Sequence, residues 1–478
     1  MREYSASIAI VGGGASGMAA AASAAENGAD VLVIESNAAV GGNGLFPRGI
    51  FGVDSRLQRR KLVFADADEV FRDCMAYSHW KTDARIIRTL IDESGGTIHW
   101  LEEKGVRFID VVHHLPNQSP EVYHITDDSE NAGKAVIKAL EEFCRRKGVT
   151  ILADTRGKKL LKDETGAVCA ICCADKGGEE VIVRAKKTIL CTGGFAGNPE
   201  YIARYYPGFD SDAVFPGWGG MRHRGDGIAM ALDAGAVIEG NFALEIAAPR
   251  IRGYEALNLI IGKPYNIWLN KFGVRFADES IVYNFAHAAN ACMRQPDSFI
   301  WILFDSGSIE KTLSDGRDII EQVHIPSGAE ARLYETIDKA RLDGLLKKSD
   351  TISELSALIG CPLDTLERSL REYNGFCEHN RDALFSKKVR YLRSLDRPPY
   401  YAVKAGADFL NTHGGIRVNE RFEALGSNFE PVENLYVAGV DFGGTDADVY
   451  NVVMSGHSFG FAVNSGRIAG RNAALHSF

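Results

Sequence analysis

Three glycines near the N-terminus have the spacing that binds the pyrophosphate of a dinucleotide. Gly12, Gly14 and Gly17 form G-x-G-x-x-G directly after the apolar run SIAIV. The first glycine permits a tight turn, the second lets the backbone approach the phosphates, and the third lets a helix pack closely on a strand. Glu35 follows 21 residues after Gly14, where a carboxylate can accept hydrogen bonds from ribose hydroxyls. The alternative for Glu35 is a solvated strand end, but the four residues together favour a nucleotide site.

These residues need a strand, a turn, a helix and a second strand to position them, and residues 7–36 have that pattern. An apolar strand ends at Val11, an alanine-rich helix runs to about Asn27, Gly28 ends it, and DVLVIE is the second strand. A helix that begins at the glycine turn points its free N–H groups and the positive end of its dipole at the phosphates.

The rest of the chain divides into helical and strand-like segments. Residues 149–196 predict a β-meander that returns to a parallel strand, and residues 242–411 predict a separate helical and mixed domain. Residues 435–444 predict a last strand that runs into a glycine turn. Helices are expected over 58–105, over 131–147 and over the C-terminal HSFGFAVNSGRIAGRNAALHS.

Two further segments favour FAD over a nicotinamide dinucleotide. GGN at Gly41–Asn43 begins six residues after Glu35, and Asp441 lies at a strand end beside a glycine turn near the C-terminus. An extended FAD needs contacts from distant parts of the chain, whereas a nicotinamide-binding domain usually lies within one contiguous segment.

Length and composition bound the class of protein. The chain has 478 residues, which predicts two or three domains, and 45% apolar with 24% charged residues is the balance of a globular protein. The formal charge of −9 argues against non-specific nucleic-acid binding. No apolar run is long enough for a membrane span, and the N-terminus leads into a strand rather than a signal peptide. We therefore expect a cytoplasmic protein.

The nine cysteines do not predict a metal or haem site. Cys169 and Cys172 form C-x-x-C, followed by Cys173, which could be a redox pair or half of a metal site. No second pair and no histidine follow at ligand spacing, so a buried strand with cysteine as a small apolar residue is favoured. No C-x-x-C-H occurs, and no metal site is predicted.

The motifs, taken in order, resemble the flavoprotein family of fumarate reductase and succinate dehydrogenase, which includes soluble fumarate reductases, urocanate reductase and 3-ketosteroid dehydrogenases. The resemblance covers nearly the whole chain. Its carriers are VGGGASGMAAA, IESNAAVGGN, AKKTILCTGGFAGN, RGDGIAMALDAGA, GVRFADES, NTHGGIRVN, ENLYVAGVDFGG and NSGRIAGRNAA.

The resemblance implies an α/β protein with a Rossmann-like FAD-binding domain and an inserted α+β capping domain. The FAD-binding domain would comprise residues 1–241 and 412–478, and the capping domain residues 242–411. GGNGLFPRG lacks the histidine that tethers the flavin in membrane-bound relatives, so FAD is expected to be non-covalent. The implied cofactor-binding residues are Gly12, Gly14, Ala15, Ser16, Gly17, Glu35, Ser36, Gly41, Gly42, Asn43, Gly44, Gly157, Thr192, Gly193, Asp226, Gly439, Asp441, Ser458 and Phe459.

Within this set, Ser458 and Phe459 open the last helix, where the resemblance implies that N–H groups face the N1–C2=O edge of the flavin. That edge gains negative charge on reduction, so a helix N-terminus stabilises the reduced form.

The sequence departs from fumarate reductases at the substrate residues. Tyr283 stands where those enzymes have the arginine that delivers a proton, and Val452 stands where a further arginine clamps the substrate carboxylate. The family's His-Thr-Met-Gly-Gly is replaced by NTHGG, and its His-Pro-Thr is missing from FALEIAAPR. Recognition of two carboxylates needs those guanidinium groups, so fumarate and succinate are not expected as substrates.

The replacements resemble the ketosteroid dehydrogenase branch. Tyr283 matches the tyrosine that transfers a proton there, and Tyr450 falls close to a second tyrosine that polarises a ketone. His413 could contact substrate or cap a loop. The resemblance implies hydride transfer between flavin N5 and a C=C or C–C bond next to a carbonyl, with Tyr283 as proton donor or acceptor. A ketone or a cyclic or aromatic substrate is favoured.

Other interpretations stay open at this point. Tyr283 could be a packed aromatic residue. The enzyme could reduce an unsaturated monocarboxylate held by Arg48, Arg250 or Arg252, or the chain could be a non-catalytic flavin carrier. If it is an enzyme, its partners are a small-molecule substrate and a separate electron carrier, either a protein or a nicotinamide or flavin, because no haem motif and no iron–sulfur spacing occur.

Overall fold

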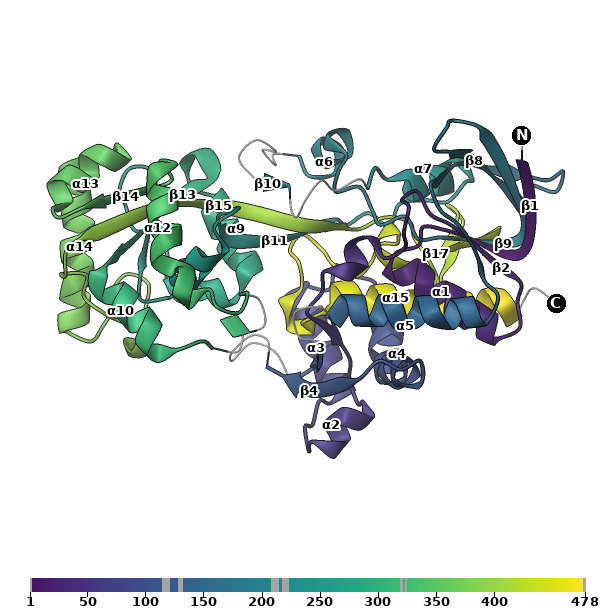
Figure 1. Ribbon diagram of the computed structural model, residues 1–478, viewed down its shortest axis with the longest axis horizontal. Coiled ribbons are helices and arrows are strands. Elements are labelled where there is room, and N and C mark those ends of the chain that lie inside the picture. The colour runs from purple at the N-terminus through teal and green to yellow at the C-terminus, as the bar shows by residue number, and fades with distance from the viewer. Residues whose placement is uncertain are drawn as a thin grey trace. The chain divides into compact units, whose positions relative to one another are not determined.

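The computed structural model describes residues 2–113, 121–127, 132–207, 215–216, 223–318, 321–322 and 325–475. The chain divides into two compact units (Figure 1). Unit 1 comprises Met1–Gly208, Gly219–Leu244 and Asn411–Phe478, and unit 2 comprises Phe209–Trp218 and Glu245–Leu410. Unit 1 is therefore built from both ends of the chain, with unit 2 inserted between them in sequence.

Unit 1 contains a sheet in which the order is β16-β17-β9-β1-β2-β6. Its strands β17, β9, β1, β2 and β6 are parallel to their neighbours, while β16 is antiparallel to β17. β8 joins the sheet antiparallel to β9, and β7 pairs with β8. The bounds are β1 (Arg2–Val11), β2 (Val31–Ile34), β6 (Thr150–Leu152), β7 (Thr155–Lys162), β8 (Val168–Asp175), β9 (Glu180–Leu190), β16 (Glu423–Leu425) and β17 (Pro431–Val437).

The parallel sheet confirms the predicted Rossmann-like class. The apolar end of β1 and all of β2 are buried, and Ile10 pairs with Val33 at the centre of the sheet. Parallel strands are covered on both faces, which explains why these segments are continuously apolar rather than alternating. Cys169, Cys172 and Cys173 all lie on β8 as free thiols, which confirms the strand, but only Cys173 of the three is buried, and Cys169 and Cys172 are partly exposed.

Two helices pack unusually closely in unit 1, and both contain small residues where they cross. They are α1 (Ala15–Glu26) and α15 (His457–Leu475), which run side by side in Figure 1. A Cβ atom on Gly466 would lie 2.1 Å from the carbonyl oxygen of Ser16, and one on Gly470 would lie 2.3 Å from that of Ala20. The glycines of NSGRIAG therefore let the C-terminal helix rest on the helix that follows the first glycine turn.

The other elements of unit 1 surround this centre. A three-stranded antiparallel sheet of order β3-β5-β4, which the sequence pattern did not predict, includes residues between the predicted helices. The bounds are β3 (Gly49–Phe51), β4 (Phe108–Val112), β5 (Tyr123–Thr126), α2 (Arg56–Arg60), α3 (Ala67–Tyr77), α4 (Ala84–Glu103), α5 (Ala132–Arg146), α6 (Pro199–Tyr205), α7 (Asp226–Asp233), and the 3₁₀ turns η1 (Gly42–Leu45), η7 (Gly439–Asp441) and η8 (Val452–Met454).

Unit 2 is built on a mixed sheet of order β10-β15-β13-β12, with β11 and β14 also paired to β15. Its strands are β10 (Phe215–Pro216), β11 (Ala243–Arg250), β12 (Ile267–Leu269), β13 (Phe299–Asp305), β14 (Leu346–Ser349) and β15 (Tyr400–His413). Its helices are α8 (Asn258–Ile261), α9 (Phe285–Met293), α10 (Ser306–Asp315), α12 (Leu333–Leu342), α13 (Ile352–Ile359) and α14 (Leu363–Glu378), with 3₁₀ turns η2 (Glu255–Leu257), η3 (Glu279–Tyr283), η4 (Pro296–Ser298), η5 (Glu330–Arg332) and η6 (Val389–Tyr391).

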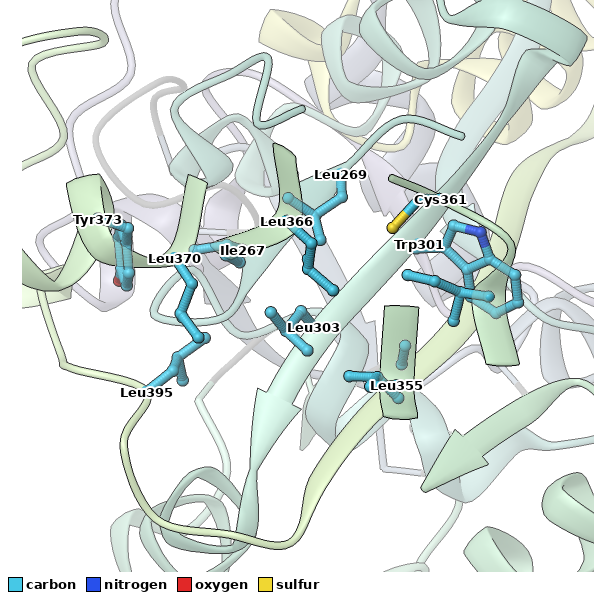
Figure 2. Close-up of a cluster of buried hydrophobic side chains, with 12 residues drawn as sticks. Ile267, Leu269, Trp301, Leu303, Leu355, Cys361, Leu366, Leu370, Tyr373 and Leu395 are labelled. Carbon is cyan, nitrogen blue, oxygen red and sulfur yellow. The ribbon is translucent and has the colours of Figure 1, made fainter. Parts of the chain in front are cut away.

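The core of unit 2 forms where α13 and α14 cover the sheet (Figure 2). Ile267 of β12 and Leu303 of β13 lie in one cluster with Leu366 and Leu370 of α14. Burial of such side chains contributes about 1.5–3 kcal/mol each. Tyr373 lies at one end of this cluster. Its ring contacts Arg275, which lies just before η3, the turn that ends at Tyr283.

Among the described residues, no helix is both long and apolar enough to cross a membrane.

Candidate functional site

The first glycine turn has the geometry that its motif predicts. Gly12 has a φ of 104°, and a Cβ there would lie 2.2 Å from the carbonyl oxygen of Cys191. A Cβ on Gly17 would lie 1.8 Å from the carbonyl oxygen of Gly12. The first and third glycines are therefore required by the close approach of β1, β9 and α1.

The middle glycine leaves open space instead. A Cβ on Gly14 would meet only the carbonyl oxygen of Gly41, at 3.9 Å, and Gly14 forms a β-bridge with Gly41. The N–H of Gly41 donates to the carbonyl oxygen of Gly13 at 2.8 Å, so the two predicted glycine turns lie against each other. Gly14 is also the N-cap of α1 and offers no side-chain cap. The helix N–H groups are thus available to an anion in this space.

Glu35 holds the glycine turn rather than ending a strand in solvent. Its side chain is buried, and Oε2 accepts a hydrogen bond from the N–H of Gly13 at 2.7 Å. Oε1 accepts from the backbone and side-chain nitrogens of Asn37 at 2.7 and 2.8 Å, and from the Ser36 hydroxyl at 3.3 Å. The solvated alternative is wrong, and the carboxylate is fixed beside the turn.

Asp441 ties the end of β17 to the end of β9. Its carboxylate accepts hydrogen bonds from the N–H of Gly194 at 2.7 Å and from the Thr192 hydroxyl at 2.8 Å, and it is fully buried. Burial raises the pKa of Asp441, and these hydrogen bonds act in the opposite direction. The structure thus brings Asp441, Thr192 and Gly193 together, and the Asp441 carboxylate bonds to the chain itself.

Other predicted cofactor residues make contacts within the protein. The Asp226 carboxylate forms a bidentate pair with Arg156, with both hydrogen bonds at 2.8 Å. Gly157 packs against Val11, and Gly439 packs against the Ser16 side chain. Contact of Asp226, Gly157 and Gly439 with FAD stays a prediction.

His223 is a candidate that no sequence motif indicated. Its Nδ1 is buried and has no hydrogen-bond partner among the residues that the structure describes. The ring lies beside Gly193, where a Cβ would come within 3.0 Å of it. Burial lowers the pKa of His223, and the nearby Glu35 opposes that shift. A buried polar atom in this place, together with the open cradle at Gly14, fits a bound nucleotide.

A second cluster in unit 1 surrounds Asp446, whose side chain is buried with those of His413 and His457. His413 Nδ1 lies 3.0 Å from Oδ2 of Asp446, and His457 Nε2 lies 3.2 and 3.1 Å from its Oδ1 and Oδ2. Burial would raise the pKa of Asp446, but the two histidines outweigh it and hold that pKa well below its usual range. Asp446 is therefore a carboxylate.

Tyr450 belongs to the same cluster. Its ring stacks on His457, with centroids 4.6 Å apart and planes at 26°, and lies edge-on to His413 at 5.2 Å. Tyr450 and His413, chosen separately from the sequence, are thus brought together in space. Asp446 and His457 were missed, although both lie in the short segment TDADVYNVVMSGH around Tyr450.

In unit 2, four buried charges anchor the turn that carries Tyr283. Glu279 accepts hydrogen bonds from Arg275 at 2.8 and 2.9 Å and pairs with Lys387 at 2.7 Å. Arg275 also pairs with Asp382 at 2.7 Å and lies between the rings of Tyr373 and Phe385. The Arg and Glu of GVRFADES are therefore structural residues that fix η3.

Tyr283 is the last residue of η3. Its ring lies 6.0 Å from that of Tyr391, and the residue is partly buried. Burial raises the pKa of the Tyr283 phenol above its ordinary value, and Asp318 and Tyr391 add to the shift. The phenol is therefore protonated near neutral pH, as a proton donor must be.

Arg48, Arg250 and Arg252, the arginines that could bind a monocarboxylate substrate, lie in different surroundings. Arg252 pairs with Asp408 at 3.3 Å. Burial lowers the pKa of Arg250, and Asp408 opposes that shift. Arg48 lies in the loop after η1, partly buried.

The FAD binding domain family matches residues 7–449 of the chain, so the protein belongs to that family. The cofactor is FAD, and the protein is an FAD-dependent oxidoreductase. The expectation of a flavoprotein enzyme is thereby confirmed.

The individual relatives have different substrates. A vinyl phenol reductase of Lactiplantibacillus plantarum is 31% identical over 98% of this chain and 96% of its own length. A urocanate reductase of Eggerthella lenta is 25% identical over 98% of this chain and 74% of its own. A crystal structure of 3-ketosteroid-Δ4-(5α)-dehydrogenase from Rhodococcus jostii has a TM-score of 0.76 at 24% identity, covering 99% of this chain and 98% of that one, and it supports the fold alone.

Proposed function

We propose that this protein reduces, or forms by dehydrogenation, a C=C bond conjugated to a ketone or to a phenol ring. The observation that carries the proposal is the Asp446 cluster, in which Tyr450 and two histidines surround a single buried carboxylate. Its one negative charge lies within hydrogen-bond distance of both histidines. Such a site suits an uncharged substrate, and among the described residues no arginine pairs with Asp446 to supply the guanidinium groups that two carboxylates need.

The residues divide the chemistry as follows. FAD, when bound at the Gly14 cradle, supplies or accepts the hydride at one carbon of the bond. Tyr283 transfers the proton at the neighbouring carbon, for which its protonated phenol is suited. Tyr450 lies in the cluster that interacts with the substrate oxygen, where negative charge develops during the reaction. Electrons reach or leave the flavin through a separate carrier, either a protein or a nicotinamide or flavin.

The names of the relatives agree with this range of substrates. The vinyl phenol reductase and a 3-oxosteroid 1-dehydrogenase of Mycolicibacterium smegmatis, 28% identical over 64% of this chain, are named for a phenol-conjugated alkene and a ring ketone.

A second candidate is a reductase of an unsaturated monocarboxylate. It is favoured by Arg250, a guanidinium whose pKa is lowered by burial and which could bind one carboxylate. An NADH:acrylate oxidoreductase of Vibrio harveyi is 24% identical over 99% of this chain, although the match covers 50% of that protein.

Reoxidation of the reduced flavin tests the proposal. The FAD-loaded protein is reduced chemically without oxygen and mixed with 4-vinylphenol, a cyclic enone, acrylate or fumarate. We expect rapid reoxidation by one or both of the first two compounds and none by fumarate. Reoxidation by acrylate alone would support the second candidate, and no reoxidation by any of them would contradict both.

A variant of the proton donor completes this test. Tyr283→Phe should slow reoxidation about 10²–10⁴-fold, the usual contribution of a general acid, with FAD content and melting temperature unchanged. The control is Tyr334→Phe, which removes the same hydroxyl from a tyrosine that is 56% exposed in the same unit. Equal rates for the two variants would refute the role of Tyr283.

A further inference from the structure

The hydrogen bonds of His457 fix the number of protons on its ring. Nδ1 lies 3.0 Å from the carbonyl oxygen of Met454, and Nε2 lies within hydrogen-bond distance of both carboxylate oxygens of Asp446. A carbonyl and a carboxylate can only accept, so both ring nitrogens of His457 must donate. A histidine that donates from both nitrogens is an imidazolium.

The charges around it support that assignment. Asp446 has four protein donors: the N–H of Asn451, the Thr445 hydroxyl, and the two histidines. Tyr206 and Cys74 are two further titratable groups near Asp446 among the described residues, and burial raises the pKa of both, so both are neutral. One imidazolium and one carboxylate then give the buried cluster a net charge of zero, whereas a neutral His457 would leave an uncompensated buried anion.

The contacts of His413 likewise determine which of its ring nitrogens carries a proton. Its Nδ1 faces the Asp446 carboxylate and must carry the proton, so in the neutral ring Nε2 bears the lone pair. We propose that the His457–Asp446 ion pair holds His413 as a base at Nε2, and that the substrate is an alkene conjugated to a phenolic hydroxyl. Asp446 and His457 are then positioning residues, and His413 is the catalytic residue.

This inference rests on the proposed function and narrows it. A ketone oxygen needs a hydrogen-bond donor, whereas a hydroxyl can give its proton to a base. Transfer of the phenolic proton to His413 Nε2 lets the electron pair of the O–H bond move through the ring, so that the outer alkene carbon takes the proton assigned to Tyr283. The carbon next to the ring then receives the hydride of reduced FAD, and the oxygen recovers its proton from His413. The net change is one hydride and one proton added to the alkene.

The protonation states are measured first, in the FAD-loaded protein labelled with ¹⁵N at histidine. We expect His457 to show two protonated nitrogens at pH 7 and His413 to show a proton on Nδ1 alone, with the signals assigned from His457→Gln and His413→Gln. A neutral His457 would overturn the inference. So would one equivalent of a transition metal in the purified protein, because the three side chains have the donor types of a metal site and a metal could replace the proton.

Two matched substrates test the base. The reduced protein is mixed with 4-vinylphenol or with its O-methyl ether, which has the same alkene and no proton to give. We expect the phenol to reoxidise the flavin at least about 100-fold faster, the lower range of general base catalysis. Equal rates would overturn this inference and leave the proposed function intact, and failure of both compounds together with the enone would contradict the proposed function.

Asp446→Asn supplies a second measurement, because asparagine keeps the size of the side chain but can no longer hold both histidines as donors. We expect it to lose most of the preference for the phenol over the ether through a lower kcat, with little change in KM. His457→Gln keeps a donor toward Asp446 and removes the charge, so it should lose part of that preference. An unchanged preference in both variants would show that the two residues are merely structural.

Discussion

The two units of this protein each bury a cluster of opposite charges, and the two clusters differ in kind. In unit 2, Arg275 and Lys387 meet Glu279 and Asp382, two fixed cations with two carboxylates. In unit 1, one carboxylate, Asp446, meets two histidines. Both clusters bring opposite charges together, and the second contains histidines, the side chains whose ordinary pKa lies closest to neutral pH.

This difference suggests a structural role for the unit 2 cluster and a chemical role for the unit 1 cluster. The unit 2 cluster is packed between aromatic rings and fixes the turn before Tyr283, so its charges have to stay constant. The unit 1 cluster stacks on Tyr450 and lies at the start of α15, and it contains His413, the proposed base. We therefore expect the reactive groups of the site in the histidine cluster of unit 1, and not in the arginine–lysine cluster of unit 2.

The largest effect on stability is expected from breaking the fixed cluster. Glu279→Ala leaves Arg275 and Lys387 without their shared carboxylate, and removal of one partner of a buried pair costs about 3–5 kcal/mol. Urea unfolding followed by circular dichroism measures this loss. The control is Glu310→Ala, whose ion pair with Arg397 is exposed and should not shift the midpoint measurably. Similar midpoints for the two variants would mean that the buried network does not hold unit 2.

A second prediction concerns His124, a buried histidine in unit 1 that forms no ion pair with a carboxylate among the described residues. His124 Nδ1 donates to the Val122 carbonyl, Nε2 of the neutral ring accepts from the Ser55 hydroxyl, and burial lowers the pKa of His124 from 6.5 to about 4. The unfolded chain binds the proton more tightly, so stability is present above pH 6.5 and is lost as pH falls to 4, by about 3 kcal/mol at 1.36 kcal/mol per pH unit.

His124→Gln should flatten this acid sensitivity between pH 6.5 and 4 in urea titrations. Asp446 acts in another window: its lowered pKa stabilises the folded protein above the unfolded value of 3.8 and loses that effect only below it. An unchanged pH dependence in His124→Gln would place the acid-sensitive group elsewhere.

The smallest effect is expected from a neutral hydrogen bond beside the titratable cluster. The Tyr206 hydroxyl donates to the carbonyl oxygens of Ala243 and His413, the latter at 3.3 Å. Tyr206→Phe should therefore cost about 1 kcal/mol of unfolding free energy, the net value of a typical hydrogen bond. If Tyr206→Phe lost as much unfolding free energy as Glu279→Ala, neutral and charged contacts would contribute equally to stability. The comparison between the two buried clusters would then have no energetic basis.

Much of the nucleotide-binding half was predictable from local sequence. The motif at Gly12, Gly14 and Gly17 has steric causes that act over a few residues, and the structure confirms the strand, turn and helix around it. FAD and the oxidoreductase class followed from several such motifs in order and are confirmed by the family match. The assignment of the two units as FAD-binding and capping domains stays a prediction, as do the individual FAD contacts.

The cluster around Asp446 could be predicted only in part. Tyr450 and His413 were singled out by position, but neither residue type nor spacing indicated that Asp446 would lie between His413 and His457, because 33 residues separate the first two in the chain. His223 was not predicted either, since a single histidine outside a motif has no local signal, and its place beside Gly193 depends on the packing of distant segments.

The sequence by itself determined the class of cofactor, because glycine spacing and apolar periodicity are local properties that short segments carry without their neighbours. Only the tertiary structure decided which charged side chains form buried ion pairs and hydrogen bonds with one another. Glu35, Asp441 and Glu279 are single acids in the sequence, and burial with particular donors makes each of them part of the scaffold. Asp446 is a similar single acid, but its buried partners are histidines, and the protons they carry depend on contacts that form only when the chain is folded.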